Sequence, residues 1–340
     1  MAERLIEVKD LKVQFATEDG LVKAVDGVSS ELQRGQVLGI VGESGSGKSV
    51  TAMTLLGLTR DKNTRFEGEV QYKGRDVLKM NEGELQEVRG NEMSMIFQDP
   101  MTSLNPVKNI GVQLVEAILL HRDVSKRAAR LRALELLKAV GIPRAEQRID
   151  DYPHQFSGGM RQRVMIAMAL INDPDLLIAD EPTTALDVTT QAQILDLMAK
   201  LQQDFGSAIV MITHDLGVMA EIADDVVVMY AARVAEQAPV DNLFRRPHHP
   251  YTWGLLGSLP RLDVNVDRLT QIQGQPPSLL NPPRGCRFHP RCPYVMEICK
   301  EKEPELLPVS HDEAHYQRCH LDEETKDREA AKLTHMGQAA

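Results

Sequence analysis

The chain has 340 residues, of which 42% are apolar and 26% are charged, and its formal net charge is -10. This composition is typical of a globular protein with an ample core, and the length exceeds that of one ordinary domain, so we expect two domains. The acidic total argues against a nucleic-acid partner, because binding a phosphate backbone requires an excess of Lys and Arg on one face.

Apolar runs of membrane-spanning length are missing from the sequence. A spanning helix needs roughly 20 apolar residues, whereas the longest candidates, at 164–171 and 226–232, have the length of core elements. The first residues, MAERLIEVKD, lack the basic start and the apolar stretch of a signal peptide. We therefore expect a protein that stays in the cytosol.

The N-terminal part of the chain predicts strands. Residues 4–15 alternate apolar and polar positions as a half-buried strand does, and 22–33 resemble an antiparallel neighbour. The run VLGIV at 37–41 is continuously apolar, which is typical of a strand buried on both faces. A helix is predicted from Lys48 to Leu58.

Between that strand and that helix lies GESGSGKS at 42–49, which matches the phosphate-loop pattern G-x-x-x-x-G-K-[ST]. Glycines allow backbone N–H groups to surround the phosphates, a lysine reaches the outer phosphates, and a hydroxyl binds Mg²⁺. An ordinary glycine-rich turn is disfavoured because a buried strand precedes the loop and a helix follows it. The residues predicted to bind ATP are Gly42, Ser44, Gly45, Ser46, Gly47, Lys48 and Ser49.

Helical spacing of apolar residues predicts a helical subdomain at about 100–160. Buried strands return at DLLIAD and AIVMITHD, separated by the amphipathic helix QAQILDLMAKLQQDFG, and VVVMY forms a further strand. This alternation predicts an α/β fold: a mainly parallel sheet with flanking helices, an antiparallel β edge and the helical subdomain.

The run LLIADE places two carboxylates at the end of one buried strand. Asp180 at the strand end can hold Mg²⁺, directly or through water. Glu181 follows, where a carboxylate can orient or deprotonate the water that attacks the γ-phosphate.

After about residue 240 the pattern becomes irregular and rich in proline. We predict a nucleotide-binding domain at 1–240, a small irregular domain with four cysteines at 241–325, and a disordered polar tail at 326–340.

Together these motifs resemble the nucleotide-binding subunits of ABC transporters. The stretch SGGMRQR at 157–163 is similar to the signature of that family, although Met160 stands where Gln is usual. The resemblance implies that Ser157, Gly158 and Gly159 bind the γ-phosphate held by a partner cassette. A glycine pair at a helix N-terminus suits this role, because the backbone can approach closely and the helix dipole favours an anion.

The same resemblance assigns further residues. Gln98 resembles the Q-loop glutamine, which shares Mg²⁺ with Ser49 and Asp180 and contacts the attacking water. His214 resembles the switch histidine, which contacts the γ-phosphate. Asp187 resembles the D-loop aspartate, which crosses the dimer interface.

Two positions depart from the usual pattern of the family. Phe15 is the candidate for the aromatic side chain that stacks on adenine, but the longer segment ATEDG that follows leaves a core role open. Ala232 stands where relatives often have Gly, which places the geometry of that turn in question.

All four cysteines, Cys286, Cys292, Cys299 and Cys319, lie in the last 55 residues. Disulfides are not expected in the cytosol, so the cluster indicates metal ligation. Spacing alone leaves zinc, an iron–sulfur cluster and free structural thiols open. His289 and His320 neighbour the cysteines and could replace one of them as a ligand, but they are expected at the surface or behind the ligands.

The segment GQPPSLLNPPRGCRFHPRCPYVMEIC, with RRPHHPYTWGLLGSLPRL before it, resembles the C-terminal region of oligopeptide and dipeptide ABC transporter ATPases. That resemblance favours a [4Fe-4S] cluster, with zinc as the alternative. It also implies an ATPase that powers peptide import from the cytosolic face of the membrane. The implied partners are two membrane permeases, a second ATP-binding subunit that is a different chain or a second copy, and an extracytoplasmic peptide-binding protein.

Two other functions are possible from the sequence. A mechanical ABC-type ATPase acting on ribosomes or DNA usually has tandem cassettes or basic surfaces, and this chain has one cassette and an acidic total. A redox sensor with a vestigial nucleotide site is disfavoured because Lys48, Asp180, Glu181 and His214 are all present.

Overall fold

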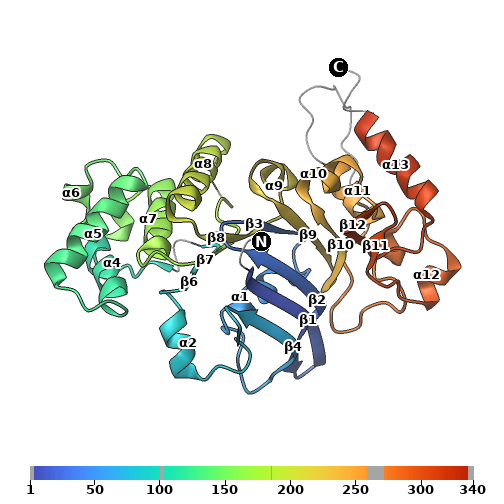
Figure 1. Ribbon diagram of the computed structural model, residues 1–340, viewed down its shortest axis with the longest axis horizontal. Coiled ribbons are helices and arrows are strands. Elements are labelled where there is room, and N and C mark those ends of the chain that lie inside the picture. Colours follow the sequence, from blue (N-terminus) through green and yellow to red (C-terminus); the bar gives the residue numbers. More distant parts are fainter. Residues whose placement is uncertain (1–3, 100–102, 185, 259–271, 336–340) are drawn as a thin grey trace. The chain divides into compact units, whose positions relative to one another are not determined.

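A computed structural model describes residues 4–99, 103–184, 186–258 and 272–335 (Figure 1). The chain divides into two compact units that are each discontinuous in sequence. We call residues 1–6, 32–36 and 72–212 the signature unit, and residues 7–31, 37–71 and 213–340 the phosphate-loop unit. The domain boundary predicted near residue 240 is not a boundary between these units.

Three parallel strands form the centre of the signature unit. In spatial order they are β8 (Ala208–Thr213), β7 (Leu176–Asp180) and β6 (Met93–Ile96). Every residue of β7 and β8 is buried, as expected for parallel strands covered on both faces. Helix α8 (Val188–Phe205) connects these two strands and buries Ile194, Met198 and Leu201, which are spaced along one helical face.

Helices make up most of the rest of this unit, and the green helices α4, α5 and α6 in Figure 1 lie in the predicted helical subdomain. Side-chain oxygens of Asn109, Ser125 and Ser157 cap three of them. Helices α4, α5 and α7 contact one another. The helices are α2 (Glu82–Val88), α4 (Ile110–Leu119), α5 (Lys126–Ala139), α6 (Ala145–Arg148), η1 (Pro153–Gln155) and α7 (Gly158–Leu170). The short strand β5 spans Arg75–Asp76.

The phosphate-loop unit contains the predicted N-terminal strands. Strands β2 (Gly20–Gln33), β1 (Arg4–Thr17) and β4 (Thr64–Tyr72) are neighbours in that order. A two-residue turn joins β1 to β2, which makes this pair antiparallel, as the sequence predicts.

A second group of strands in this unit has the order β11-β12-β10-β9-β3. Only β3 and β9 pair in parallel, whereas the other neighbours are antiparallel, so the fold is α/β with a mixed sheet rather than a mainly parallel one. The reason is local: β9 returns as β10 through the two-residue turn Ala231–Ala232, with φ of 45° and 70°, and so tight a turn allows only antiparallel pairing. The strands are β3 (Val37–Val41), β9 (Asp225–Tyr230), β10 (Arg233–Pro239), β11 (Leu307–Val309) and β12 (Asp312–Gln317).

The C-terminal part is more regular than its proline content predicts. Its last helix, α13, continues to His335, so the prediction of a disordered tail from residue 326 is wrong up to that point. The helix forms because Lys326, Glu329 and Ala330 are buried and because it contacts α11. Residues 336–340 lie outside the described residues. The helices of this unit are α1 (Lys48–Leu55), α9 (Leu216–Ile222), α10 (Val240–Arg245), α11 (Pro250–Gly257), η2 (His289–Arg291), α12 (Glu297–Glu301) and α13 (Glu323–His335).

Among the described residues, no helix combines the length and the apolar character needed to cross a lipid bilayer.

Candidate functional site

The phosphate loop connects the fully buried strand β3 to helix α1, as predicted. Gly47 precedes the helix with a φ of 103°, and Lys48 begins it. The Lys48 side chain is buried, and its Nζ donates hydrogen bonds to the carbonyl oxygens of Gly42 at 2.7 Å and Glu43 at 3.0 Å. Two backbone carbonyl groups of the phosphate loop therefore hold the lysine side chain in place.

The three glycines of the phosphate loop are required for different physical reasons. A Cβ at Gly42 would lie 2.2 Å from the carbonyl oxygen of Met229, and one at Gly47 would lie 2.4 Å from that of Ala24. These two positions exclude a side chain because the protein itself fills the space. Gly45 has a φ of 77° but open space around it, which suits the close approach of a ligand to the backbone.

The serines of the loop differ in exposure. Ser44 is exposed, and Ser49 is half-buried in the first turn of α1. Ser46 is buried, and its hydroxyl has no hydrogen-bond partner in the described part of the chain. An unsatisfied buried hydroxyl costs on the order of 1–3 kcal/mol, so this oxygen is available to a ligand.

Two other predicted residues belong to the phosphate-loop unit. Phe15 is half-buried on strand β1, so it is not a core residue. His214 is exposed at the start of the segment that leads from β8 into α9, where Asp215 caps the helix.

The signature unit brings two of the three predicted catalytic side chains, Gln98 and Glu181, into contact. Asp180 is buried as the last residue of β7, and Glu181 follows with a φ of 47°, a strained conformation for a residue other than glycine. The Glu181 Oε2 accepts hydrogen bonds from Gln98 Nε2 at 3.0 Å and from Thr184 Oγ1 at 2.8 Å. The strained turn therefore presents a carboxylate whose position is fixed by two donors.

The signature residues lie at the N-terminus of α7. Ser157 caps this helix by accepting a hydrogen bond from the Met160 N–H at 3.4 Å, and Gly158 has open space around it. A Cβ at Gly159 would lie 2.9 Å from the Thr190 methyl group. The backbone at Gly158 is therefore open to the close approach of a ligand.

Asp187 caps α8 in the same unit. Its carboxylate accepts hydrogen bonds from the Thr190 N–H at 2.9 Å and from the Thr190 hydroxyl at 2.7 Å, and these bonds lower its pKa. Thr190 therefore forms hydrogen bonds with Asp187 and lies next to Gly159. Neither Thr184 nor Thr190 was predicted as a site residue from the sequence, although each follows a predicted site residue by three positions.

The C-terminal part of the phosphate-loop unit contacts the loop directly, which no motif indicated. Tyr251 Oη accepts a hydrogen bond from the Glu43 N–H at 2.8 Å. The Arg291 guanidinium forms an ion pair with the Glu43 carboxylate through both terminal nitrogens, at 2.5 and 2.9 Å. Neither contact could be found from spacing, because the partners are more than 200 positions apart.

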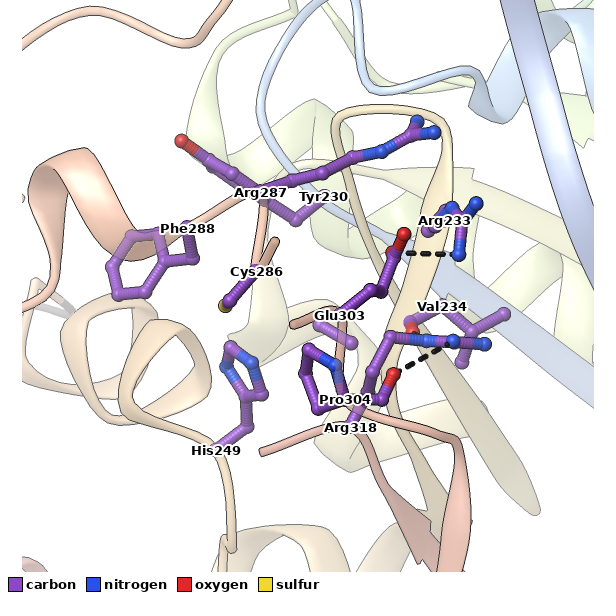
Figure 2. A pocket seen from close by; sticks show the side chains of 11 residues that line it. Tyr230, Arg233, Val234, His249, Cys286, Arg287, Phe288, Glu303, Pro304 and Arg318 are labelled. Atoms are coloured by element: carbon purple, nitrogen blue, oxygen red, sulfur yellow. Dashed lines mark hydrogen bonds and ion pairs between the residues drawn. The ribbon is translucent and has the colours of Figure 1, made fainter. Parts of the chain in front are cut away.

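A small cavity of about 20 Å³ lies beside this region (Figure 2). Figure 2 shows Cys286 and His249 on one side of it, and Arg233, Glu303 and Arg318 on the other. Its volume is that of a single water molecule, so it is not a ligand site.

Two of the four predicted metal ligands are thiols that burial keeps protonated. Burial raises the pKa of Cys292 to about 12 and that of Cys319 to about 11. Cys299 is buried, and its carbonyl oxygen accepts a hydrogen bond from the Cys286 N–H at 2.8 Å. However, no three of the four sulfur atoms lie within 4.8 Å of one another. His289 and His320 contact the backbone carbonyls of Cys286 and Lys302.

Within the described residues, one group has three ligand atoms this close together: His248, His311 and Asp327. The Asp327 carboxylate already forms an ion pair with Arg246 at 2.8 Å.

Comparison with known proteins identifies the family to which this chain belongs. The ABC transporter family model matches residues 25–184, and the model of the oligopeptide/dipeptide transporter C-terminal region matches residues 235–299. The chain is 56% identical over 309 residues to the dipeptide transport ATP-binding protein DppD of Lactococcus lactis, covering 91% of this chain and 88% of that protein. The chain belongs to the ATP-binding subunits of oligopeptide and dipeptide ABC transporters. The resemblance seen in the sequence is thereby confirmed.

Other members of this family are similarly close. The oligopeptide transport ATP-binding protein OppD of Bacillus subtilis is 53% identical, with 92% of this chain and 87% of that protein covered. OppD of Escherichia coli is also 53% identical, with 89% and 90% covered.

Solved structures match the cassette part of this family member. The dimeric bacterial ABC transporter cassette MJ0796 superposes with a TM-score of 0.62 and 30% identity, covering 69% of this chain and 98% of that chain. A post-hydrolysis dimer of the same cassette, bound to ADP and Pi, also gives 0.62 at 28% identity, with 69% and 98% covered. The ABC-type nucleotide-binding fold is therefore shown.

Proposed function

We propose that this ATP-binding subunit hydrolyses Mg·ATP to power the import of oligopeptides or dipeptides. The observation that carries the proposal is the phosphate loop, with Lys48 fixed by its own backbone, in a chain whose relatives are named as peptide transport ATP-binding proteins. Peptide length and sequence preference would be set by other chains of the transporter.

Each reaction centre would be shared by two cassettes. The phosphate loop of one chain would hold ATP, and the N-terminus of α7 in the partner would contact the γ-phosphate through Ser157, Gly158 and Gly159. Helix N-termini favour anions because their first N–H groups lack partners within the helix. The dimeric cassettes among the solved structures support this arrangement.

The remaining site residues would complete this centre. Ser49, Gln98 and Asp180 offer the hard oxygen ligands that Mg²⁺ prefers. Glu181 would orient or deprotonate the attacking water, and His214 would contact the γ-phosphate. Asp187 would lie at the dimer interface, and Phe15 would stack on adenine.

The transporter would contain more chains than this one. We propose two membrane permeases, a second ATP-binding subunit that is either a different chain or another copy, and an extracytoplasmic peptide-binding protein. The ATPase would lie on the cytosolic face of the membrane as a peripheral subunit.

The test uses the tagged full-length chain, purified from detergent-solubilised membranes. Co-purification of permeases with ATP turnover by the complex is expected. Ribosomes or DNA in place of permeases would favour a mechanical ATPase instead. Gly159→Asp should abolish turnover, because it places a carboxylate against the γ-phosphate, whereas Met160→Gln restores the usual family residue and should keep it. Full turnover in the Gly159→Asp complex would refute shared reaction centres.

For the cysteines we propose a [4Fe-4S] cluster, on the sequence resemblance of the segment that carries them. A single tetrahedral zinc would need sulfur atoms about 3.8 Å apart, and no three of these sulfur atoms lie within 4.8 Å. Zinc bound by the same four cysteines is the alternative. Anaerobic purification with assays of iron, acid-labile sulfide and zinc tests the proposal, and one zinc per chain without iron would overturn it.

A further inference from the structure

Every polar group of Glu43, the second residue of the phosphate loop, has a partner in the phosphate-loop unit. Its N–H donates to Tyr251 Oη at 2.8 Å, and its carbonyl oxygen accepts a hydrogen bond from Lys48 Nζ at 3.0 Å. Its carboxylate accepts two hydrogen bonds from Arg291. One residue therefore joins the ATP-binding lysine to the C-terminal region of the chain.

The two C-terminal partners of Glu43 are held rigidly. Tyr251 is fully buried, and its ring packs against Tyr230 and Phe288, with centroids 4.6 and 5.4 Å away. The Arg291 side chain is 4% exposed, and its Nε donates to the Gln273 carbonyl at 2.9 Å. Buried side chains with fixed rotamers can hold a flexible loop in one conformation.

The start of α11, which carries Tyr251, is anchored in turn by a buried carboxylate. Glu236 on strand β10 accepts hydrogen bonds from the His248 N–H at 2.5 Å and from the His249 N–H at 3.1 Å. A ring nitrogen of His315 lies 2.7 Å from the same carboxylate. The position of Tyr251 is thus set by the sheet of the C-terminal region and not by the loop.

The charge of Glu43 matters because the loop binds phosphates. An uncompensated carboxylate here would repel a triphosphate through Coulomb interaction in a partly buried site. The bidentate Arg291 guanidinium neutralises it, and the hydrogen bond to Glu43 raises the pKa of Arg291 further above its usual value. The loop consequently faces its ligand without a net repulsive charge from Glu43.

We propose that Arg291 and Tyr251 are positioning residues for ATP: Arg291 cancels the charge of Glu43 and Tyr251 holds the Glu43 backbone, so that the C-terminal region sets the nucleotide affinity of the cassette. The proposal rests on ATP binding by the phosphate loop. A wild-type chain that binds no ATP would overturn that premise and not the role of Arg291.

A double-mutant cycle tests the proposal in the full-length chain. The measurement is calorimetric titration with Mg²⁺ and a non-hydrolysable ATP analogue. Arg291→Met is expected to raise the dissociation constant roughly tenfold, because it leaves the Glu43 charge unpaired beside the phosphates. Glu43→Gln alone should change it by less than about threefold, and the double variant should return to within about threefold of wild type.

Two readouts separate positioning from a general loss of structure. The Arg291→Met defect should shrink at high salt, since ions screen the repulsion. Lys12→Met, which removes surface ion pairs with Asp10 and Glu67 in the same unit, should leave the affinity unchanged. Wild-type affinity in Arg291→Met, or a double variant as weak as Arg291→Met, would overturn the proposal.

Thermal melting checks that the variants fold. If Arg291→Met does not fold, Arg291→Lys and Tyr251→Phe decide the matter, because each keeps most of the side chain and removes one hydrogen bond to Glu43. Weaker binding in either variant, by a few-fold, supports the proposal. Wild-type affinity in both overturns it.

Discussion

The side-chain amide of Gln98 donates a hydrogen bond to the Glu181 carboxylate at 3.0 Å, although the two residues are 83 positions apart. They follow neighbouring parallel strands, β6 and β7, whose carboxyl ends meet at one edge of the sheet. Polar side chains gather at such edges in α/β folds, because ligands bind there. The contact links the residue proposed to bind Mg²⁺ with the one proposed to act on water.

Glu181→Gln is expected to keep ATP binding and to reduce turnover at least about a hundredfold. The amide can still accept the hydrogen bond from Thr184, but it cannot take a proton from water. Turnover by the permease complex and ATP binding by the full-length chain are the two measurements. Near-normal turnover would refute the role proposed for Glu181.

Lys48→Ala is expected to raise the dissociation constant for ATP by about tenfold or more, because a buried charge-assisted contact to the phosphates is lost. The measurement is the same calorimetric titration. Lys12→Ala is a suitable control, since Lys12 forms ion pairs with Asp10 and Glu67 at the surface. Equal affinity in the wild-type chain and in Lys48→Ala would contradict the site.

Asp26→Asn is expected to destabilise the fold by about 3 kcal/mol, because the amide leaves the buried Arg287 guanidinium without its carboxylate partner. Asp26 is 7% exposed, and its carboxylate forms ion pairs with Arg287 and with Arg233, at 2.9 Å; Arg233 also pairs with Glu303. Burial alone would raise its pKa, but the two arginines hold the pKa below the ordinary value of 3.8.

The pH dependence of that variant follows from the sign of the shift. A lowered pKa means that the ion pairs stabilise the fold fully above about pH 4, and that this stabilisation is lost as the pH falls through the lower folded value. Urea unfolding from pH 7 to pH 3 should therefore show a shallower acid decline for Asp26→Asn than for wild type. Parallel declines would show that Asp26 does not titrate as expected.

Ala232→Val is expected to lower stability by about 2 kcal/mol or more, since a β-branched side chain is strongly disfavoured at a φ of 70°. Ala232→Gly should stay within about 1 kcal/mol of wild type, because relief of backbone strain offsets the loss of a buried methyl group. Urea unfolding measures both. The Ala232 N–H donates to the Ser46 carbonyl at 2.9 Å, so the valine variant should also weaken ATP binding.

The strand and the helix on either side of the phosphate loop could be predicted because the motif is local. The pattern from Gly42 to Ser49 needs only a strand before it and a helix after it, and the structure contains both. The mixed sheet was missed because the pairing of β10 with β12 joins residues about 80 positions apart, and no sequence pattern specifies such a partner. The last helix was missed for a similar reason, since its polar sequence becomes helical through burial against α11.

The sequence by itself determined the family and the motifs that carry it, namely the phosphate-loop pattern, the two carboxylates at the end of β7 and the signature, because these are short patterns that depend on the nearest residues. Only the tertiary structure decided that Tyr251 and Arg291 hold Glu43. An ion pair between distant residues exists only when packing brings the two side chains within a few ångströms. That distance depends on the whole fold, so no local sequence pattern specifies it.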